Sequence, residues 1–167
     1  MTQMNDVKLL ELLASKICHD LISPVGAVSN GVEILEEMGA DAGEDVTELI
    51  SFSATQAAAK LKAMRMAYGL GGSDPSIKFE DVHKLFEDFI AGEKRLSQDW
   101  DPYADYGIES CDGLSKMLLC CLKLAAEGLP RGGVVSVKKG EDGIQICAEG
   151  ENAHFRTNVV SALDNAI

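Results

Sequence analysis

The sequence predicts an α+β protein, in which an N-terminal helical hairpin precedes a mixed domain of helices and strands. Two observations lead to this fold class. Residues 5–69 are dominated by helix-forming residues with helical apolar spacing, interrupted once by a short glycine-containing segment. After a glycine-rich stretch, helical patterns are mixed with short runs that alternate apolar and polar residues, as strands do.

Two helices are expected in the N-terminal part. The first runs from about Asn5 to Met38, and the second from about Glu44 to Gly69, because "GADAGED" between them contains two glycines that interrupt a helix. The glycine-rich segment "GLGGSDPS" follows the second helix and reads as a linker that ends in a proline turn. We therefore place a domain boundary there, with residues 1–72 as a helical hairpin domain and residues 73–167 as a second domain.

The second domain should contain three helices and three short strands. Its helices are expected over Phe79–Leu96, Ser115–Gly128 and Asn152–Ile167. A short strand is expected within Tyr103–Ser110, and a β-hairpin with strands Val134–Lys138 and Ile144–Ala148 surrounds a Gly-Glu-Asp-Gly turn.

The charge of the chain restricts its partners. The formal net charge is −12 at pH 7, which argues against nucleic acid because its phosphates would be repelled at long range. This charge fits a basic partner, or one with a locally positive face, although solubility alone explains it equally well. No run of eighteen apolar residues is present, and the start lacks the features of a secretory signal, so we expect a cytoplasmic protein without a membrane span.

Five cysteines are present, and they point to no metal site. There is no Cys-x-x-Cys pair and no cysteine–histidine cluster at zinc spacing. An odd number of cysteines without a signal sequence indicates reduced and mostly buried thiols.

A heptad pattern in the first helix predicts where His19 points. The apolar series falls on positions a and d, with Ala14 at a and Ile17 at d, and it is completed by Val7, Leu10, Leu21, Pro24, Val28, Gly31 and Leu35. His19 then falls on position f, farthest from the packed seam. The side chain of His19 should therefore point to water, where it is either a functional residue or an idle surface histidine.

The neighbours of His19 on the same face favour a docking surface. Leu12 and Ile22 place apolar side chains near the histidine, and Gly26 leaves a gap without a side chain. Two serines, Ser15 and Ser23, lie one turn before and one turn after it. A partner protein could approach the ring across this surface.

Two charged neighbours suggest chemistry at the ring. Lys16 is one turn before His19 and would neutralise an anion placed on the imidazole. Asp20 would hold one ring nitrogen protonated, which leaves the other free as a nucleophile. Pro24 removes the amide that would bond the carbonyl of Asp20, at a cost of about 3 kcal/mol, so a kink is expected within one turn of His19.

These residues resemble a known family. The stretch "HDLISPV" (residues 19–25) resembles the box around the phosphoaccepting histidine of sensor histidine kinases. The longer stretch "LASKICHDLISPVGAVSNGVEIL" (residues 13–35) is closer to the ChpT-type histidine phosphotransferases of alphaproteobacteria. The resemblance implies a dimerising helical hairpin followed by a degenerate histidine-kinase-like ATPase domain, which is a Bergerat-type α/β sandwich.

The second domain departs from a kinase where a kinase would hold its nucleotide. The stretch "LLCCLKLAAEGLPRGGVVSV" (residues 118–137) is similar to the asparagine-containing kinase motif, but Leu124 and Cys120 occupy the asparagine positions. Magnesium prefers oxygen ligands, which neither residue supplies. Ala148 stands where a kinase has its adenine-binding aspartate, so we expect no ATP binding. Compared with the family, a further strand or helix is expected after "SALDNAI".

The resemblance implies a phosphorelay. His19 would take a phosphoryl group from one response-regulator receiver domain, or from the receiver of a hybrid histidine kinase, and give it to another receiver. No cofactor is expected, because the receiver supplies its own Mg²⁺. The apolar seam of two helices needs a partner, which a homodimeric four-helix bundle provides, with seam candidates on the second helix at Leu49, Phe52, Ala59 and Met66.

Two other functions stay open at this point. The chain could be an active histidine kinase core that binds ATP through atypical residues, or a non-enzymatic dimeric scaffold with a vestigial histidine. Nucleotide binding would support the first of these alternatives. Failure to take up label from a phosphorylated receiver would support the second.

Overall fold

The computed structural model describes residues 6–141 and 143–164. It divides into two compact units, of which the first ends at Met64 and the second begins at Arg65. The two units are described separately below.

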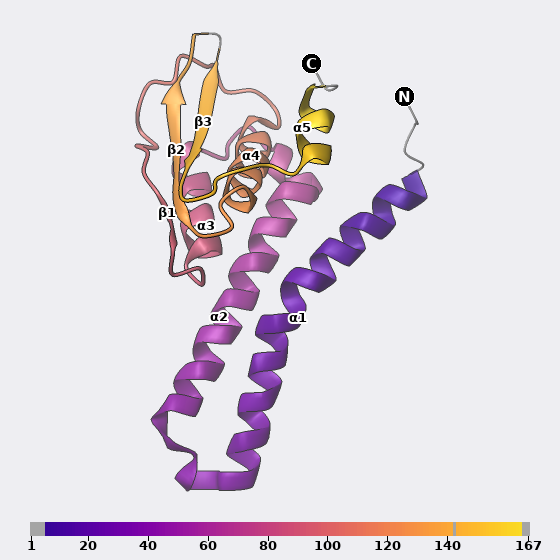
Figure 1. Cartoon of the computed structure of the whole chain (residues 1–167), viewed down its shortest axis with the longest axis vertical. Coiled ribbons are helices and arrows are strands. Elements are labelled where there is room, and N and C mark those ends of the chain that lie inside the picture. Colours follow the sequence, from indigo (N-terminus) through magenta and orange to yellow (C-terminus); the bar gives the residue numbers. More distant parts are fainter. Residues whose placement is uncertain (1–5, 142, 165–167) are drawn as a thin grey trace. The chain divides into compact units, whose positions relative to one another are not determined.

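The first unit is a helical hairpin (Figure 1). Helix α1 spans Asp6–Met38, a short 3-10 helix η1 spans Gly39–Ala42, and helix α2 begins at Gly43 and continues to Tyr68. The connection is tight because Gly39 and Gly43 adopt positive φ angles of 56° and 75°, which other residues rarely do. Both predicted helices are therefore confirmed, and the predicted break lies where η1 turns the chain.

The packed face of α1 follows the predicted heptad from Ile17 onward, whereas Val7, Leu10 and Ala14 are exposed in the single chain. Pro24 and Gly31, which complete the a/d series, are the two buried residues of this helix. In α2 the predicted seam residue Ala59 is buried, whereas Leu49 and Phe52 are 43% and 54% exposed in the single chain. Their burial between two hairpins remains a prediction.

The second unit contains a small sheet and four helical segments. The short 3-10 helix η2 spans Leu70–Ser73. Helices α3, α4 and α5 span Phe79–Ile90, Leu114–Glu127 and Thr157–Asp164, and strands β1, β2 and β3 span Leu96–Gln98, Gly133–Lys139 and Ile144–Glu149. The strand order is β1-β2-β3, with β1 parallel to β2 and β2 antiparallel to β3. The predicted β-hairpin is confirmed, with Val135 opposite Ala148.

A single apolar core joins α3, α4 and the sheet of this unit. Its fully buried side chains are Val82 and Phe86 from α3, Leu119 and Leu122 from α4, and Val135 from β2. The apolar spacing that predicted α3 and α4 gives each helix one buried face. The α+β class is therefore confirmed.

The segment between α3 and α4 differs from the prediction. The helix expected to reach Leu96 ends at Ile90, and Leu96 instead begins β1. Gly92, a poor helix former, lies in the turn that follows α3. The strand expected within Tyr103–Ser110 is absent, and that segment is a loop. Tyr106 holds this loop, because its buried ring contacts Phe79 edge-on and its hydroxyl donates to the carbonyl of Asp101 at 2.7 Å.

Two further expectations were wrong. The helix predicted from Asn152 begins only at Thr157, because Asn152 adopts a left-handed φ of 58° that interrupts a helix; the end of the predicted helix, residues 165–167, lies outside the described residues. The cysteines are not mostly buried: Cys18, Cys111 and Cys121 are exposed, and Cys120 and Cys147 are half-buried.

Candidate functional site

His19 lies on α1, and its imidazole stands clear of the hairpin. The side chain is 84% exposed. The heptad register predicted this orientation, because an f position faces away from the packed seam. A ring that is so open can be reached by an atom of another protein.

Asp20 contacts the histidine ring through its carboxylate. Its Oδ1 lies 3.1 Å from Nδ1 of His19, and its side chain is only 15% exposed. When Nδ1 carries the proton, it donates to this carboxylate, and the lone pair then resides on Nε2. Across residues 6–141 and 143–164, no hydrogen bond to Nε2 is present. The predicted arrangement of one protonated nitrogen and one nucleophilic nitrogen is therefore geometrically possible.

Lys16 is paired with the same carboxylate. Its Nζ lies 3.4 Å from Oδ2 of Asp20, one helical turn away. The three side chains therefore form a row in which Asp20 bridges the lysine and the imidazole. The sequence predicted Lys16 as a partner for an anion on the ring, and the structure shows it next to the carboxylate that contacts the ring.

The residues predicted to surround His19 are accessible on the same helix. Leu12 and Ile22 are 52% and 73% exposed. Ser15 and Ser23 are exposed too. Gly26 leaves an open space, since a methyl group added there would meet nothing within 4 Å. We call Leu12, Ser15, Ile22, Ser23 and Gly26 the rim of the site.

Pro24 lies one turn beyond Asp20 and is buried. A proline in a helix interior cannot bond the carbonyl four residues earlier, which here belongs to Asp20. Figure 1 shows that α1 is bent partway along its length. The backbone hydrogen bond that proline removes is therefore the one to the carbonyl of Asp20, the residue that contacts the imidazole.

The positions that the sequence resemblance assigns to a kinase nucleotide site carry apolar or weakly polar side chains. Leu124 is half-buried on α4. The thiol of Cys120 lies 3.7 Å from the carbonyl of Ala67, and Ala148 packs against the core. Among the described residues, no three histidine, cysteine or acidic side chains are grouped so that they could hold a metal ion.

Lys123 was not singled out from the sequence. It is 5% exposed, its Nζ lies 3.3 Å from the hydroxyl of Tyr68, and the same nitrogen lies over the rings of Tyr68 and Phe89 at 4.8 and 5.1 Å. Aromatic faces stabilise a desolvated cation, so these rings compensate part of the cost of burying this charge. The local sequence carries a signal for this burial, because Lys123 is the only charged residue in residues 117–126 and has Leu119 and Ala126 on the same helical face.

The other two histidines lie in the second unit. His83 is half-buried, and its ring centroid lies 4.9 Å from that of Trp100. His154 is exposed, and its Nδ1 lies 2.6 Å from the carbonyl oxygen of Asn152.

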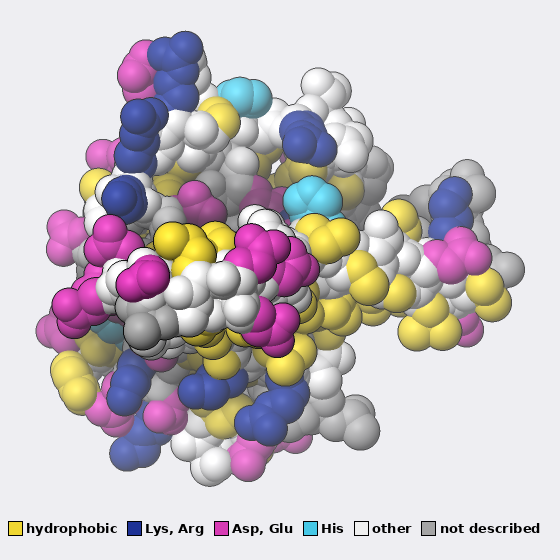
Figure 2. Space-filling model, turned by 90° about the horizontal axis from the view of Figure 1, so that it is seen from below, with side chains coloured by type: hydrophobic (Ala, Val, Ile, Leu, Met, Phe, Trp, Pro, Cys, Tyr) yellow, Lys and Arg dark blue, Asp and Glu magenta, His cyan; other side chains and the backbone are white. Residues whose placement is uncertain are grey.

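One end of the hairpin carries charge of a single sign. Residues 17–59 contain no lysine or arginine, and within this range seven carboxylates cluster around η1, at Glu33, Glu36, Glu37, Asp41, Glu44, Asp45 and Glu48. Figure 2 is viewed from this end and shows Asp and Glu side chains in the foreground. A partner that contacts this part of α1 therefore meets a negative potential.

The second unit matches a known family. A family model described as the histidine phosphotransferase C-terminal domain matches residues 79–166, which is more than half of the chain. The region begins at α3 and extends past α5. The chain therefore belongs to the histidine phosphotransferases, and the ChpT-type resemblance found in the sequence is confirmed.

Two relatives extend this similarity beyond the second unit. The chain is 39% identical over 138 residues to the protein phosphotransferase ChpT of Brucella abortus (strain 2308), an alignment that includes 78% of this chain and 61% of that protein. The chain thus spans 61% of the length of this curated relative. A solved structure of a bacterial phosphotransferase superposes with a TM-score of 0.72 at 30% identity, covering 96% of this chain and 76% of that one.

No helix in the described ranges is long and apolar enough to cross a membrane.

Proposed function

We propose that this protein is a histidine phosphotransferase that relays a phosphoryl group between response-regulator receiver domains through His19. The observation that carries this proposal is the exposed imidazole, whose Nδ1 lies 3.1 Å from Asp20 while Nε2 faces no partner among the described residues. Membership of the family and the names of the two relatives support the same reaction.

The reaction needs one nucleophile from this chain. The lone pair of Nε2 attacks the phosphorus of a phospho-aspartate on the first receiver. The P–N bond forms, the P–O bond to the aspartate breaks, and the aspartate leaves as a carboxylate. Nδ1 keeps its proton, which it donates to Asp20 in a hydrogen bond. Transfer to the second receiver reverses these steps, and each receiver supplies the Mg²⁺ and the lysine that neutralise the phosphoryl oxygens.

The rim residues provide the docking surface in this proposal. Exposed Leu12 and Ile22 offer apolar area on both sides of His19, and the open space at Gly26 lets a receiver approach the helix closely. The receiver of a hybrid histidine kinase is a suitable donor, and a free response regulator is a suitable acceptor.

The arrangement of the protein around the site is part of the proposal. Residues 1–72 serve phosphotransfer and dimerisation, and two hairpins pair into a four-helix bundle that covers exposed apolar side chains such as Leu49 and Phe52. Each dimer then presents two copies of His19. Residues 73–167 form a degenerate Bergerat-type ATPase fold without a nucleotide, and the relay operates in the cytoplasm.

Transfer of label tests this function. The full chain is mixed with candidate receivers that carry labelled phosphoryl groups, and we expect an acid-labile label on the protein that a second receiver removes. A His19→Ala variant should take up none, while His83→Ala and His154→Ala controls should behave like the parent. Equal labelling of the His19→Ala variant would refute the site. Label from ATP without a receiver would indicate a kinase, and no label from any receiver would indicate a scaffold.

A further inference from the structure

The side chains of Lys16, Asp20 and His19 form a continuous row on α1. One oxygen of Asp20 lies 3.1 Å from Nδ1 of His19, and the other lies 3.4 Å from Nζ of Lys16. We propose that Lys16 is a positioning residue that acts through Asp20 and sets how tightly His19 holds the phosphoryl group, instead of contacting that group itself. This inference rests on the proposed function.

The charge on the imidazole explains why Asp20 matters after transfer. When Nε2 bonds to phosphorus and Nδ1 keeps its proton, the ring carries a positive charge. A carboxylate at 3.1 Å stabilises that charge, and because the side chain of Asp20 is only 15% exposed, water screens the attraction less than it would at an open surface. Asp20 therefore favours the phosphorylated form of His19.

Lys16 acts in the opposite direction. Its ammonium neutralises part of the negative charge of Asp20 from the far oxygen, and it adds a positive charge to the same side of the helix. Both effects destabilise a positively charged ring. The negative phosphoryl group on Nε2 attracts the ammonium, but it is bonded to the ring nitrogen remote from Asp20. In this proposal the effect on the nearer ring charge is the larger one, so the lysine makes the phosphohistidine less stable and easier to discharge.

A relay needs this balance. The protein must accept a phosphoryl group from one receiver and release it to another, so the phosphohistidine must be neither much more stable nor much less stable than a phospho-aspartate. Asp20 alone would favour retention of the group. The pair of Asp20 with Lys16 brings the two states closer in free energy, which allows transfer in both directions.

The alternative role of Lys16 predicts the opposite sign. If its ammonium contacts the phosphoryl oxygens, removing it would destabilise the phosphohistidine. If it acts through Asp20, removing it would stabilise the phosphohistidine. An equilibrium measurement separates the two roles, and it does not depend on how fast each variant reacts.

The experiment compares the full chain with its Lys16→Met variant. Each is incubated at low salt with one phosphorylated receiver until the distribution of label is constant, and the ratio of label on His19 to label on the receiver is measured. We expect Lys16→Met to raise this ratio by about two- to fivefold, the effect of one partly exposed charge pair, and we expect the increase to shrink at high salt. Lys8→Met removes an equal charge from the same helix and should leave the ratio unchanged.

A second variant tests whether the effect passes through Asp20. In an Asp20→Asn background, Lys16→Met should change the ratio by much less than it does in the parent, because the carboxylate that the lysine neutralises is gone. A lower ratio for Lys16→Met, or an equal change in both backgrounds, would overturn the inference. Such results would leave the proposed function intact, since that function fails only if the parent takes up no label or His19→Ala takes up as much.

Discussion

Gly31 of α1 lies directly against Ile50 of α2. A methyl group added at Gly31 would stand 2.5 Å from Cγ1 and 3.1 Å from Cδ1 of Ile50, well inside contact distance. Gly31 is itself buried on the packed face of α1. The two helices therefore approach closely here because this position carries no side chain, and the glycine sets their spacing in the half of the hairpin beyond His19.

Replacing Gly31 with alanine should destabilise the hairpin. Overpacking against Ile50 costs about 1 to 3 kcal/mol, and the better helix propensity of alanine offsets up to about 1 kcal/mol of this. We expect a net loss in the free energy of unfolding, measured by thermal or denaturant unfolding of the full chain.

Gly26→Ala is a matched control on the same helix. A methyl group there meets nothing, so this variant should be as stable as the parent or more stable. Equal behaviour of the two variants would show that the contact with Ile50 does not set the helix spacing.

A charge at the rim should weaken receiver docking without unfolding the protein. Ile22 is 73% exposed, so Ile22→Glu removes little packing within the chain, but it would bury a carboxylate against a docked receiver. We expect the KM for the phosphorylated receiver to rise about tenfold or more while the melting temperature stays within error. Leu12→Glu should act in the same direction. Unchanged transfer by both variants would argue against the rim as a docking surface.

A large side chain at Gly26 should block transfer sterically. Gly26→Trp would place a large ring in the open space two turns beyond His19, where its Cβ would meet no atom of the hairpin within 4 Å. We expect label uptake to fall while hairpin stability is retained, which a thermal melt can verify. Gly26→Ala carries a smaller side chain at the same position, so we expect a smaller loss of label uptake for this variant. Normal transfer by the tryptophan variant would show that receivers do not cover this position.

Much of the hairpin site could be predicted from the sequence, because it depends on one helix. A heptad register fixes which residues share a face, so the exposure of His19 and its neighbours follows from spacing alone. Asp20 directly follows His19 in the sequence, so a contact between its carboxylate and the imidazole could also be predicted. The pairing of Lys16 with Asp20 was missed, because an i, i+4 spacing permits a contact but does not decide between an ion pair and a free amine.

The second unit was less predictable because tertiary contacts decide its local structure. The three-residue strand β1 is too short to show a pattern, and it exists because it pairs with β2. The loop that holds Tyr106 contains a strand-like run, but its buried tyrosine ring and the bond to Asp101 favour an irregular path. The apolar residues around Lys123 place it on a buried helix face, but no local pattern reveals the rings that contact its ammonium, which come from residues 34 and 55 positions away.

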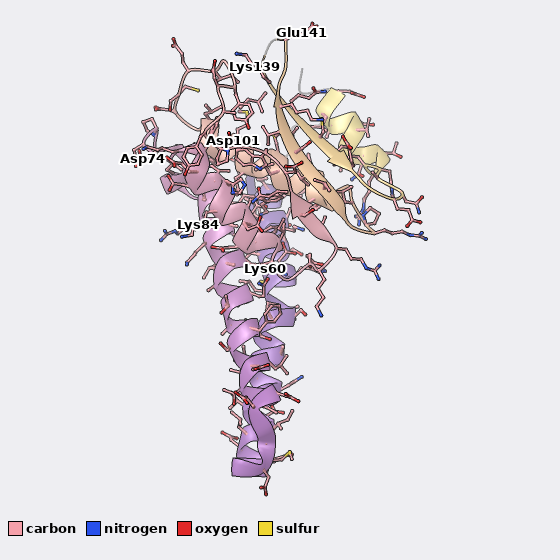
Figure 3. The ribbon with its side chains drawn as sticks, turned by 90° about the vertical axis from the view of Figure 1, so that its left-hand side faces the viewer. Lys60, Asp74, Lys84, Asp101, Lys139 and Glu141 are labelled. Carbon is pink, nitrogen blue, oxygen red and sulfur yellow. The ribbon has the colours of Figure 1, made fainter. Side chains whose placement is uncertain are left out.

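The loop between β1 and α4 should weaken in acid. The backbone amide of Gly107 donates a hydrogen bond to the carboxylate of Asp105. The ammonium of Lys139, which is labelled in Figure 3, lies 3.5 Å from the same carboxylate. Together these two contacts lower the pKa of Asp105 below its ordinary value of 3.8. A lowered pKa in the folded state means that the stabilisation is complete above 3.8 and is lost as the pH falls through the folded value. The Asp105→Asn variant should therefore lose less stability than the parent when the pH is lowered from 5 to 3. Identical acid dependence of the two unfolding curves would contradict this assignment.

Nucleotide binding gives a direct test of the second unit. The sequence resemblance assigns the half-buried Leu124 to the position of a kinase's magnesium-binding asparagine, and Ala148 to that of its adenine-binding aspartate. Because Mg²⁺ needs oxygen ligands and a purine needs a polar partner for its amino group, we expect no heat of binding and no shift in melting temperature with millimolar Mg·ATP. An authentic histidine kinase serves as the positive control in the same titration. Saturable binding with a shift in melting temperature would revive the kinase alternative, and transfer of label from ATP to His19 would establish it.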